Sequence, residues 1–178
     1  MAEIKHLVNR IYCSRSAYYN PKFRENIRFC APKIDVAVSH LTSILSLKEL
    51  PLINMAPISG NGRKRTDVAS FYTYGFMSFT GSIIIDPRFQ LKKLLNVISH
   101  EIWHVRQFER KELSFKRDSF GRLEYIIWKD KPYNKANLTS KTAEKNFKEY
   151  ISQPWEAEAF ANEGWLIDEA LRVVNPLI

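Results

Sequence analysis

The sequence predicts an α+β fold in a single domain of 178 residues. Three observations support this prediction: a long amphipathic helical pattern between residues 86 and 112, a β-prone stretch directly before it, and a second helical pattern near the C-terminus. Hydrophobic residues make up 45% of the chain, which at this length is enough to bury one sizeable core. We therefore expect a small sheet packed on a central helix, followed by a C-terminal helix.

The first 60 residues are expected to be mainly helical. Residues 2 to 19 carry a helical pattern, and a second helix is predicted from about Pro32 to Leu50. One face of this second helix collects Ile34, Val38, Leu41, Leu45 and Lys48. From Pro51 to Arg65 the proline, glycine and serine content predicts a loop.

The middle part, residues 66 to 112, combines strands with the long helix. The runs 68–74 and 76–85 are rich in β-branched and aromatic residues and are predicted to be strands, with Gly75 and Gly81 at turns or bulges. Asp86 is the expected N-cap of the long helix, and Pro87 lies in its first turn. The helix is predicted to run to about Glu112 on an apolar stripe formed by Leu91, Leu94, Leu95, Ile98, Ile102 and Val105.

The last part, residues 113 to 178, begins with a polar, turn-prone stretch that holds a predicted hairpin around Leu123 to Tyr133. A short helix is predicted for residues 141–150. The final helix is expected to begin near Ser152 as its N-cap, with Pro154 in the first turn, and to continue to Val174.

The stretch from His100 to His104 reads HEIWH, which is the pattern H-E-x-x-H. Residues four apart lie one turn apart on the same helix face, so both imidazoles can reach one ion, and Glu101 leans over the position where a water would sit. The apolar stripe lies nearly opposite the two histidines. We therefore predict that His100 and His104 are zinc ligands and that Glu101 is the catalytic base.

A catalytic zinc needs a third protein ligand. No histidine follows His104, and His6 and His40 lie upstream, so we expect a carboxylate. On the final helix Glu156 faces inward with apolar residues, whereas Glu158 points about 200° away from it. An inward carboxylate is costly unless it is paired or bound to a metal, so Glu156 is favoured and Glu158 is the alternative.

Other residues are candidates for supporting roles. Glu163 lies two turns beyond Glu156 on the same face, where it could hydrogen-bond a zinc-bound histidine or simply be a helix-surface glutamate, and both interpretations stay open. Stabilisation of negative charge in the transition state has three candidates, which stay open: Tyr125, Tyr150 and Arg106. The segment 81–86 is expected to be a plain core strand, with an edge strand that pairs with extended substrate as the alternative.

The stretches HEIWHVRQ from His100 and PWEAEA from Pro154 resemble small zincin-like metallopeptidases of the gluzincin type, including proteins encoded by tailed bacteriophages. The resemblance covers about residues 91 to 163. It implies a zincin-like fold, in which the H-E-x-x-H helix and a later glutamate helix pack over zinc, and hydrolysis of peptide or amide bonds. In gluzincins the later glutamate is usually followed after three residues by Ala and then Asn or Asp, a spacing that fits Glu158 better than Glu156.

Two other interpretations stay open. The phage association also fits a virion structural or assembly protein that keeps a zincin-like fold with a non-catalytic metal or none. The net charge of +8 and the basic cluster Arg63, Lys64 and Arg65 are compatible with nucleic acid, as in a DNA-associated protease resembling the SprT group. Nucleic acid is not favoured, because that group uses a third histidine and often a cysteine-rich zinc ribbon, which this chain lacks.

Location is predicted from what the sequence lacks. The N-terminus has no continuous apolar run of a secretion signal, and no stretch approaches the roughly 20 apolar residues of a membrane span. Cys13 and Cys30 are too few for a disulfide scaffold and are expected to be reduced core thiols. We expect a protein of the host cytoplasm or the virion that acts on a protein or peptide and does not bind membranes.

Overall fold

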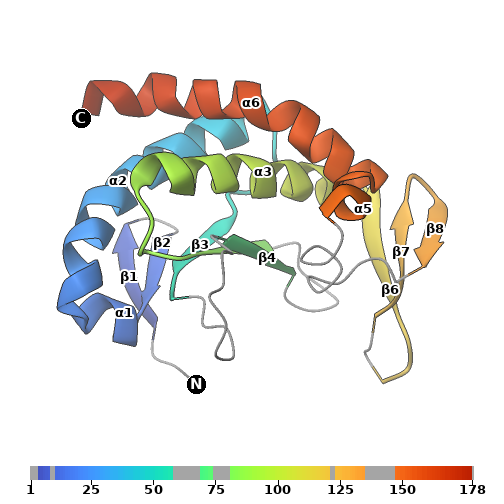
Figure 1. Cartoon of the computed structure of the whole chain (residues 1–178), viewed down its shortest axis with the longest axis horizontal. Helices are drawn as coiled ribbons and strands as arrows, with labels where there is room; N and C mark the ends of the chain where they lie inside the picture. Colours follow the sequence, from blue (N-terminus) through green and yellow to red (C-terminus); the bar gives the residue numbers. More distant parts are fainter. Residues whose placement is uncertain are drawn as a thin grey trace.

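The computed structural model describes residues 4–8, 11–57, 69–73, 81–120, 123–134 and 147–177. The chain forms a mixed helix and sheet structure, as the sequence predicts, with two separate sheets. Figure 1 shows the larger sheet under a layer of two long helices, a third long helix on the outside, and the smaller sheet at one end.

The larger sheet has the strand order β1-β2-β3-β5-β4. Strands β2, β3 and β5 are parallel to one another, and β1 and β4 pair with them in the antiparallel direction. The strands are β1 (Ile4–Val8), β2 (Ile11–Ser14), β3 (Leu52–Met55), β4 (Ala69–Thr73) and β5 (Gly81–Ile85).

The long helices lie on one side of this sheet (Figure 1). Helices α2 and α3 pack on the sheet and on each other, and α6 packs on both of them. The helices are α1 (Arg15–Tyr19), α2 (Pro21–Ile44), α3 (Leu91–Glu109), α5 (Phe147–Ile151) and α6 (Pro154–Val174), followed by the 3₁₀ turn η2 (Asn175–Leu177).

The main core lies between the larger sheet and the helices. Its largest fully buried side chains come from β2, α2, β3, β5 and α3: Ile11, Ile27, Ile34, Leu41, Ile53, Met55, Ile83, Ile85, Leu94, Leu95, Ile98 and Ile102. The whole predicted apolar stripe of α3 is buried. The stripe therefore holds α3 on the sheet and leaves its other side for contact with α6.

The smaller sheet is an antiparallel meander of β6 (Leu113–Arg117), β7 (Leu123–Trp128) and β8 (Lys131–Asn134). A second apolar cluster joins this sheet to the end of α3 and the start of α6. Its buried members are Phe108, Leu113, Ile126, Trp128 and Trp155. The ring of Trp155 lies 6.4 Å from that of Trp128 and 5.4 Å from that of Tyr133, so the meander holds the first turn of α6.

The prediction for the N-terminal part is wrong in two places. Strands β1 and β2 form where residues 2 to 19 were predicted to be helical, and only the end of that segment is a helix, α1 (Arg15–Tyr19). Strand β3 interrupts the loop predicted from Pro51 to Arg65. In β2 and β3 burial alternates from one residue to the next, which is the strand period. These strands are only four residues long and pair with distant segments, so the local pattern does not identify them. The basic cluster at residues 63–65 lies outside the described residues.

Helix α2 is longer at its start and shorter at its end than predicted. It begins at Pro21, after Asn20, whose side chain accepts a hydrogen bond from the Lys22 backbone N–H. Ser46 has a φ of 53°, in the left-handed region, and the chain leaves the helix there. Lys48 therefore lies beyond the helix, while the four apolar residues of the predicted face are buried.

The ends of α3 are also corrected. The predicted N-cap Asp86 is instead buried in a turn before the helix, where its carboxylate accepts hydrogen bonds from the backbone and guanidinium of Arg88. Gln90 occupies the cap position, and Leu91 is the first helical residue. The helix stops at Glu109 rather than near Glu112, just before a left-handed residue at position 111.

In the C-terminal part, the hairpin predicted around Leu123 to Tyr133 is confirmed as β7 and β8, and β6 adds an unpredicted strand beside it. The short helix is α5; residues 135–146 lie outside the described ranges. Helix α6 runs to Val174 as predicted, with Pro154 as its first residue, although Gln153 rather than Ser152 occupies the cap position.

Two further predictions concern β5 and the cysteines. The core strand expected at 81–86 is confirmed and the edge-strand alternative is wrong, because β5 lies between β3 and β4, and β4 is at the edge among the described strands. Cys13 and Cys30 are free, buried thiols, as predicted. None of the helices in the described ranges is both long and apolar enough to span a membrane.

The packing of α3 on the sheet makes a direct prediction for stability. Ile98→Ala removes a fully buried side chain from the core and should lower the free energy of unfolding by about 2–5 kcal/mol. Val36→Ala on the exposed side of α2 should change it by less than about 0.5 kcal/mol. Denaturant unfolding followed by circular dichroism measures both; equal losses would contradict the assigned core.

Candidate metal centre

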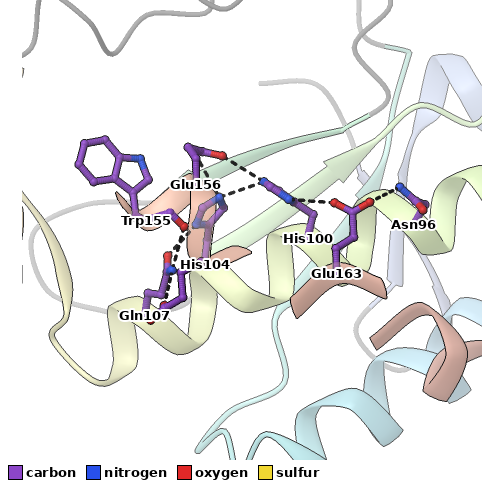
Figure 2. Close-up of polar contacts among 8 residues, drawn as sticks. Asn96, His100, His104, Gln107, Trp155, Glu156 and Glu163 are labelled. Carbon is purple, nitrogen blue, oxygen red and sulfur yellow. Dashed lines mark hydrogen bonds and ion pairs between the residues drawn. The ribbon is translucent and has the colours of Figure 1, made fainter. Parts of the chain in front are cut away.

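Helices α3 and α6 bring three predicted ligands together. His100 and His104 lie one turn apart on α3, and Glu156 lies in the first turn of α6. One ligand atom from each lies within 4.8 Å of the other two. Figure 2 shows the Glu156 carboxylate directed at the two imidazole rings. The residues are 8%, 7% and 5% exposed, so the group is buried between the helices.

The separations within this group suit a small tetrahedral ion. The Nε2 atoms of His100 and His104 are 3.2 Å apart, and the Glu156 oxygens lie 3.2 Å from the first and 3.5 Å from the second. Zinc binds imidazole nitrogen and carboxylate oxygen at about 2.0–2.2 Å, which places tetrahedral ligands roughly 3.3–3.5 Å apart. Calcium instead takes six to eight oxygen ligands, which two imidazoles do not supply.

The other nitrogen of each histidine has its own hydrogen-bond partner (Figure 2). His100 Nδ1 lies 3.2 Å from Glu163 Oε2, so of the two interpretations of Glu163 the structure has the contact with a histidine, and Asn96 donates to the other Glu163 oxygen at 2.7 Å. His104 Nδ1 lies 2.8 Å from Gln107 Oε1. Both rings thus donate from Nδ1 and direct Nε2 at the shared centre, as imidazole ligands of metals usually do.

Glu158, the alternative third ligand, lies outside the group. Its carboxylate accepts hydrogen bonds from Trp103 Nε1 at 3.0 Å and Gln107 Nε2 at 2.8 Å, and it pairs with Lys129 at 3.2 Å. Burial by itself would raise the pKa of Glu158, but these three donors outweigh it and lower the pKa. Of the two glutamates, the structure therefore brings only Glu156 to the histidines.

Glu101 is half-buried and lies beside the ligand group. Burial raises the pKa of its carboxyl group, the two histidines lower it, and the nearby Glu156 and Glu163 raise it further, with a net upward shift. Glu101 therefore lies close enough to both histidines and to Glu156 to interact with their charges.

His100 and Glu156 stabilise each other's charged forms. Burial opposes the charged form of His100, but hydrogen bonds to Glu156 and Glu163 and the attraction of the nearby carboxylates outweigh it and raise the pKa of His100 to about 10. Burial would raise the pKa of Glu156, but the two histidines outweigh it and lower that pKa to about 2. The buried cluster is thus a cation–carboxylate group at neutral pH.

The three candidates for stabilisation of negative charge in the transition state, Arg106, Tyr125 and Tyr150, stay open. The guanidinium of Arg106 lies 4.3 Å over the ring of Trp103, and Tyr125 faces Lys116. Tyr150 is half-buried on α5 and stays a candidate. His40 pairs with Glu169 of α6 at 2.7 Å and is not part of the candidate ligand group.

Sequence reasoning missed two residues that hold the histidines, Asn96 and Gln107. Asn96 lies four positions before His100, and Gln107 lies three positions after His104. Both positions fall on the histidine face of α3, where i, i+3 and i, i+4 neighbours meet. These two residues could have been predicted from the sequence, because the polar residues on this helix face continue beyond the H-E-x-x-H motif in both directions.

No family model, curated protein or solved structure matches the chain. The resemblance to zincin-like gluzincin proteins therefore stays a prediction, and the function has to be inferred from the arrangement of the side chains.

Metal uptake should depend on pH. His100 has a folded-state pKa of about 10, above its ordinary value of 6.5, so at pH 7 it must lose a proton before it can bind a metal. Zinc affinity should therefore rise by up to about tenfold per pH unit for each proton released. Calorimetry in two buffers of different ionisation enthalpy should show release of at least one proton at pH 7; pH-independent affinity would contradict this.

Proposed function

We propose that this protein is a zinc-dependent peptidase in which His100, His104 and Glu156 hold the ion and Glu101 is the general base. The observation that carries the proposal is the convergence of two imidazole nitrogens and one carboxylate at separations of 3.2–3.5 Å, with a further glutamate next to the first histidine. This donor set matches that of peptidases that use two histidines and one glutamate.

The number of ligands supports a catalytic rather than a structural ion. Structural zinc sites are closed by four protein ligands, which are mostly cysteine and histidine, whereas catalytic sites use three and keep one position for water or substrate. Within the described part of the chain the candidate group has three members. Cys13 and Cys30 lie in the main core and do not join it.

The chemistry follows from the positions of the side chains. Bound zinc would supply Lewis acidity that polarises the scissile carbonyl and lowers the pKa of a coordinated water. Glu101 accepts the proton of the attacking water and donates it to the leaving amine nitrogen, so the C–N bond breaks into an acid and an amine. Burial raises the pKa of the Glu101 carboxyl group, and a more basic carboxylate accepts a proton more readily.

A second candidate function is a structural protein that keeps the ion and cleaves nothing. The burial of the ligands favours it, because each is less than 10% exposed and a substrate must reach the ion. The half-buried Glu101 favours the peptidase instead, because a structural zinc site does not require a general base beside the ion. Replacement of Glu101 separates the two.

Metal content provides the first test. The purified protein should contain about one zinc per chain, and His100→Ala should lose most of it, because a centre with two protein ligands is far weaker than one with three. His40→Ala is the matched control and should keep its zinc, since His40 pairs with Glu169. Elemental analysis by mass spectrometry measures both; equal zinc loss in the two variants would contradict the assigned centre.

Hydrolysis provides the second test. Glu101→Gln should keep zinc and lower cleavage of a peptide library by roughly 10²–10⁴-fold, because it removes the group that transfers the proton. The matched control, Glu109→Gln on the same helix, should keep full activity, since among the described residues Glu109 accepts from the Lys48 backbone N–H and takes no part in the ligand group. A zinc-loaded wild-type protein that cleaves no peptide in the library would favour the structural candidate.

A further inference from the structure

Gln107 is fully buried between α3 and α6, and its amide makes three hydrogen bonds. Its Nε2 donates to the backbone oxygen of Trp155 at 3.0 Å and to Glu158 Oε2 at 2.8 Å. Its Oε1 lies 2.8 Å from His104 Nδ1. The side chain thus contacts a metal-ligand histidine, the peptide group before Glu156, and the carboxylate two residues after Glu156.

These partners permit only one orientation of the amide. A backbone carbonyl and a carboxylate accept hydrogen bonds and donate none, so the NH₂ end of Gln107 must face Trp155 and Glu158. The amide oxygen then faces His104. Because that oxygen can only accept, His104 must donate from Nδ1. In the neutral ring, this tautomer leaves the lone pair of Nε2 directed toward His100 and Glu156.

Glu158 is held in place by groups from two other parts of the fold. Trp103 and Gln107 donate from α3, and Lys129 pairs with it from the turn between β7 and β8. A neutral acceptor such as Ser or Asn could rotate and offer a donor to Gln107, whereas an ionised carboxylate cannot. Glu158 therefore ensures that the amide of Gln107 does not reverse.

We propose that Gln107 and Glu158 are positioning residues that together fix His104 as the Nδ1–H tautomer and so present its Nε2 to the metal. The proposal deepens the function proposed above and rests on the assignment of His104 as a ligand. It gives Glu158, the rival ligand by sequence, a separate role: it acts on the centre through Gln107 and His104 without touching the ion.

The test compares isosteric variants of the full-length protein. Gln107→Met removes the amide, Glu158→Met removes the acceptor, and Glu158→Gln keeps an oxygen for Gln107 while removing the charge. Glu169→Met is the matched control, because Glu169 lies on the same helix but pairs with His40 and Arg172. Zinc affinity is measured by competition with a chromophoric chelator. Nitrogen-15 spectra of labelled histidines report which ring nitrogen carries the proton and how fast that proton exchanges.

Gln107→Met should weaken zinc binding by about 10–100-fold, and Glu158→Met should weaken it in the same direction. In both, the Nδ1–H proton of His104 should exchange faster while that of His100, held by Glu163, stays unchanged. Glu158→Gln puts an amide that can rotate and donate in place of the carboxylate, so it should weaken zinc binding in the same direction as Glu158→Met but by less. Glu169→Met should keep zinc affinity within about threefold of wild type. A loss of fold stability alone would not alter one histidine and spare the other.

Two outcomes would overturn the proposal. One is an unchanged His104 proton in Gln107→Met and Glu158→Met; the other is an equal change at His100 and His104. If the wild-type protein binds no zinc, the proposed function fails. The exchange of the His104 proton in the metal-free protein still decides whether Gln107 and Glu158 position that ring.

Discussion

The antiparallel contact between α3 and α6 is the constraint on which the candidate centre depends. Polar contacts along it run in opposite directions on the two helices: Asn96 meets Glu163, His100 meets Glu156 and Glu163, and Gln107 meets Trp155. The two histidines can converge on one point by helix geometry alone, but the third ligand comes from 52 residues further along the chain, at position 156 against 104. Only the packing of the helices brings it there.

The composition of this contact favours a bound cation. Three ionisable side chains are buried at the centre, and each has hydrogen-bond partners, so the network is satisfied at the cost of desolvating charge. Without a metal, a proton on His100 offsets the charge of Glu156. A divalent ion can replace that proton and bind all three side chains at once. If stability were the only requirement, apolar side chains in place of His100, His104 and Glu156 would pack as well.

The sequence allowed a better prediction of which residues come together at the site than of the strands of the fold. Helical spacing was enough to place His100 and His104 on one face and to choose Glu156 over Glu158, because those questions depend only on positions along one helix. The strands β1, β2 and β3 were missed because they are four or five residues long and are stabilised by pairing with distant segments. The contact of Glu158 with Trp103 and Gln107 was also missed, because it depends on how α6 packs on α3 and not on positions along one helix.

The dipeptide Trp155–Glu156 connects the smaller sheet to the candidate metal centre. The ring of Trp155 packs against Trp128 and Tyr133 of the meander, its carbonyl accepts from Gln107, and the next side chain is the ligand carboxylate. Pro154 precedes it as the first helical residue and fixes the backbone at the entry to α6. The restricted φ of Pro154, the ring packing of Trp155 and the hydrogen bond to its carbonyl therefore all restrain the backbone directly before Glu156. Because a metal ligand has to be held to within about half an ångström, the meander serves the site by fixing this one turn.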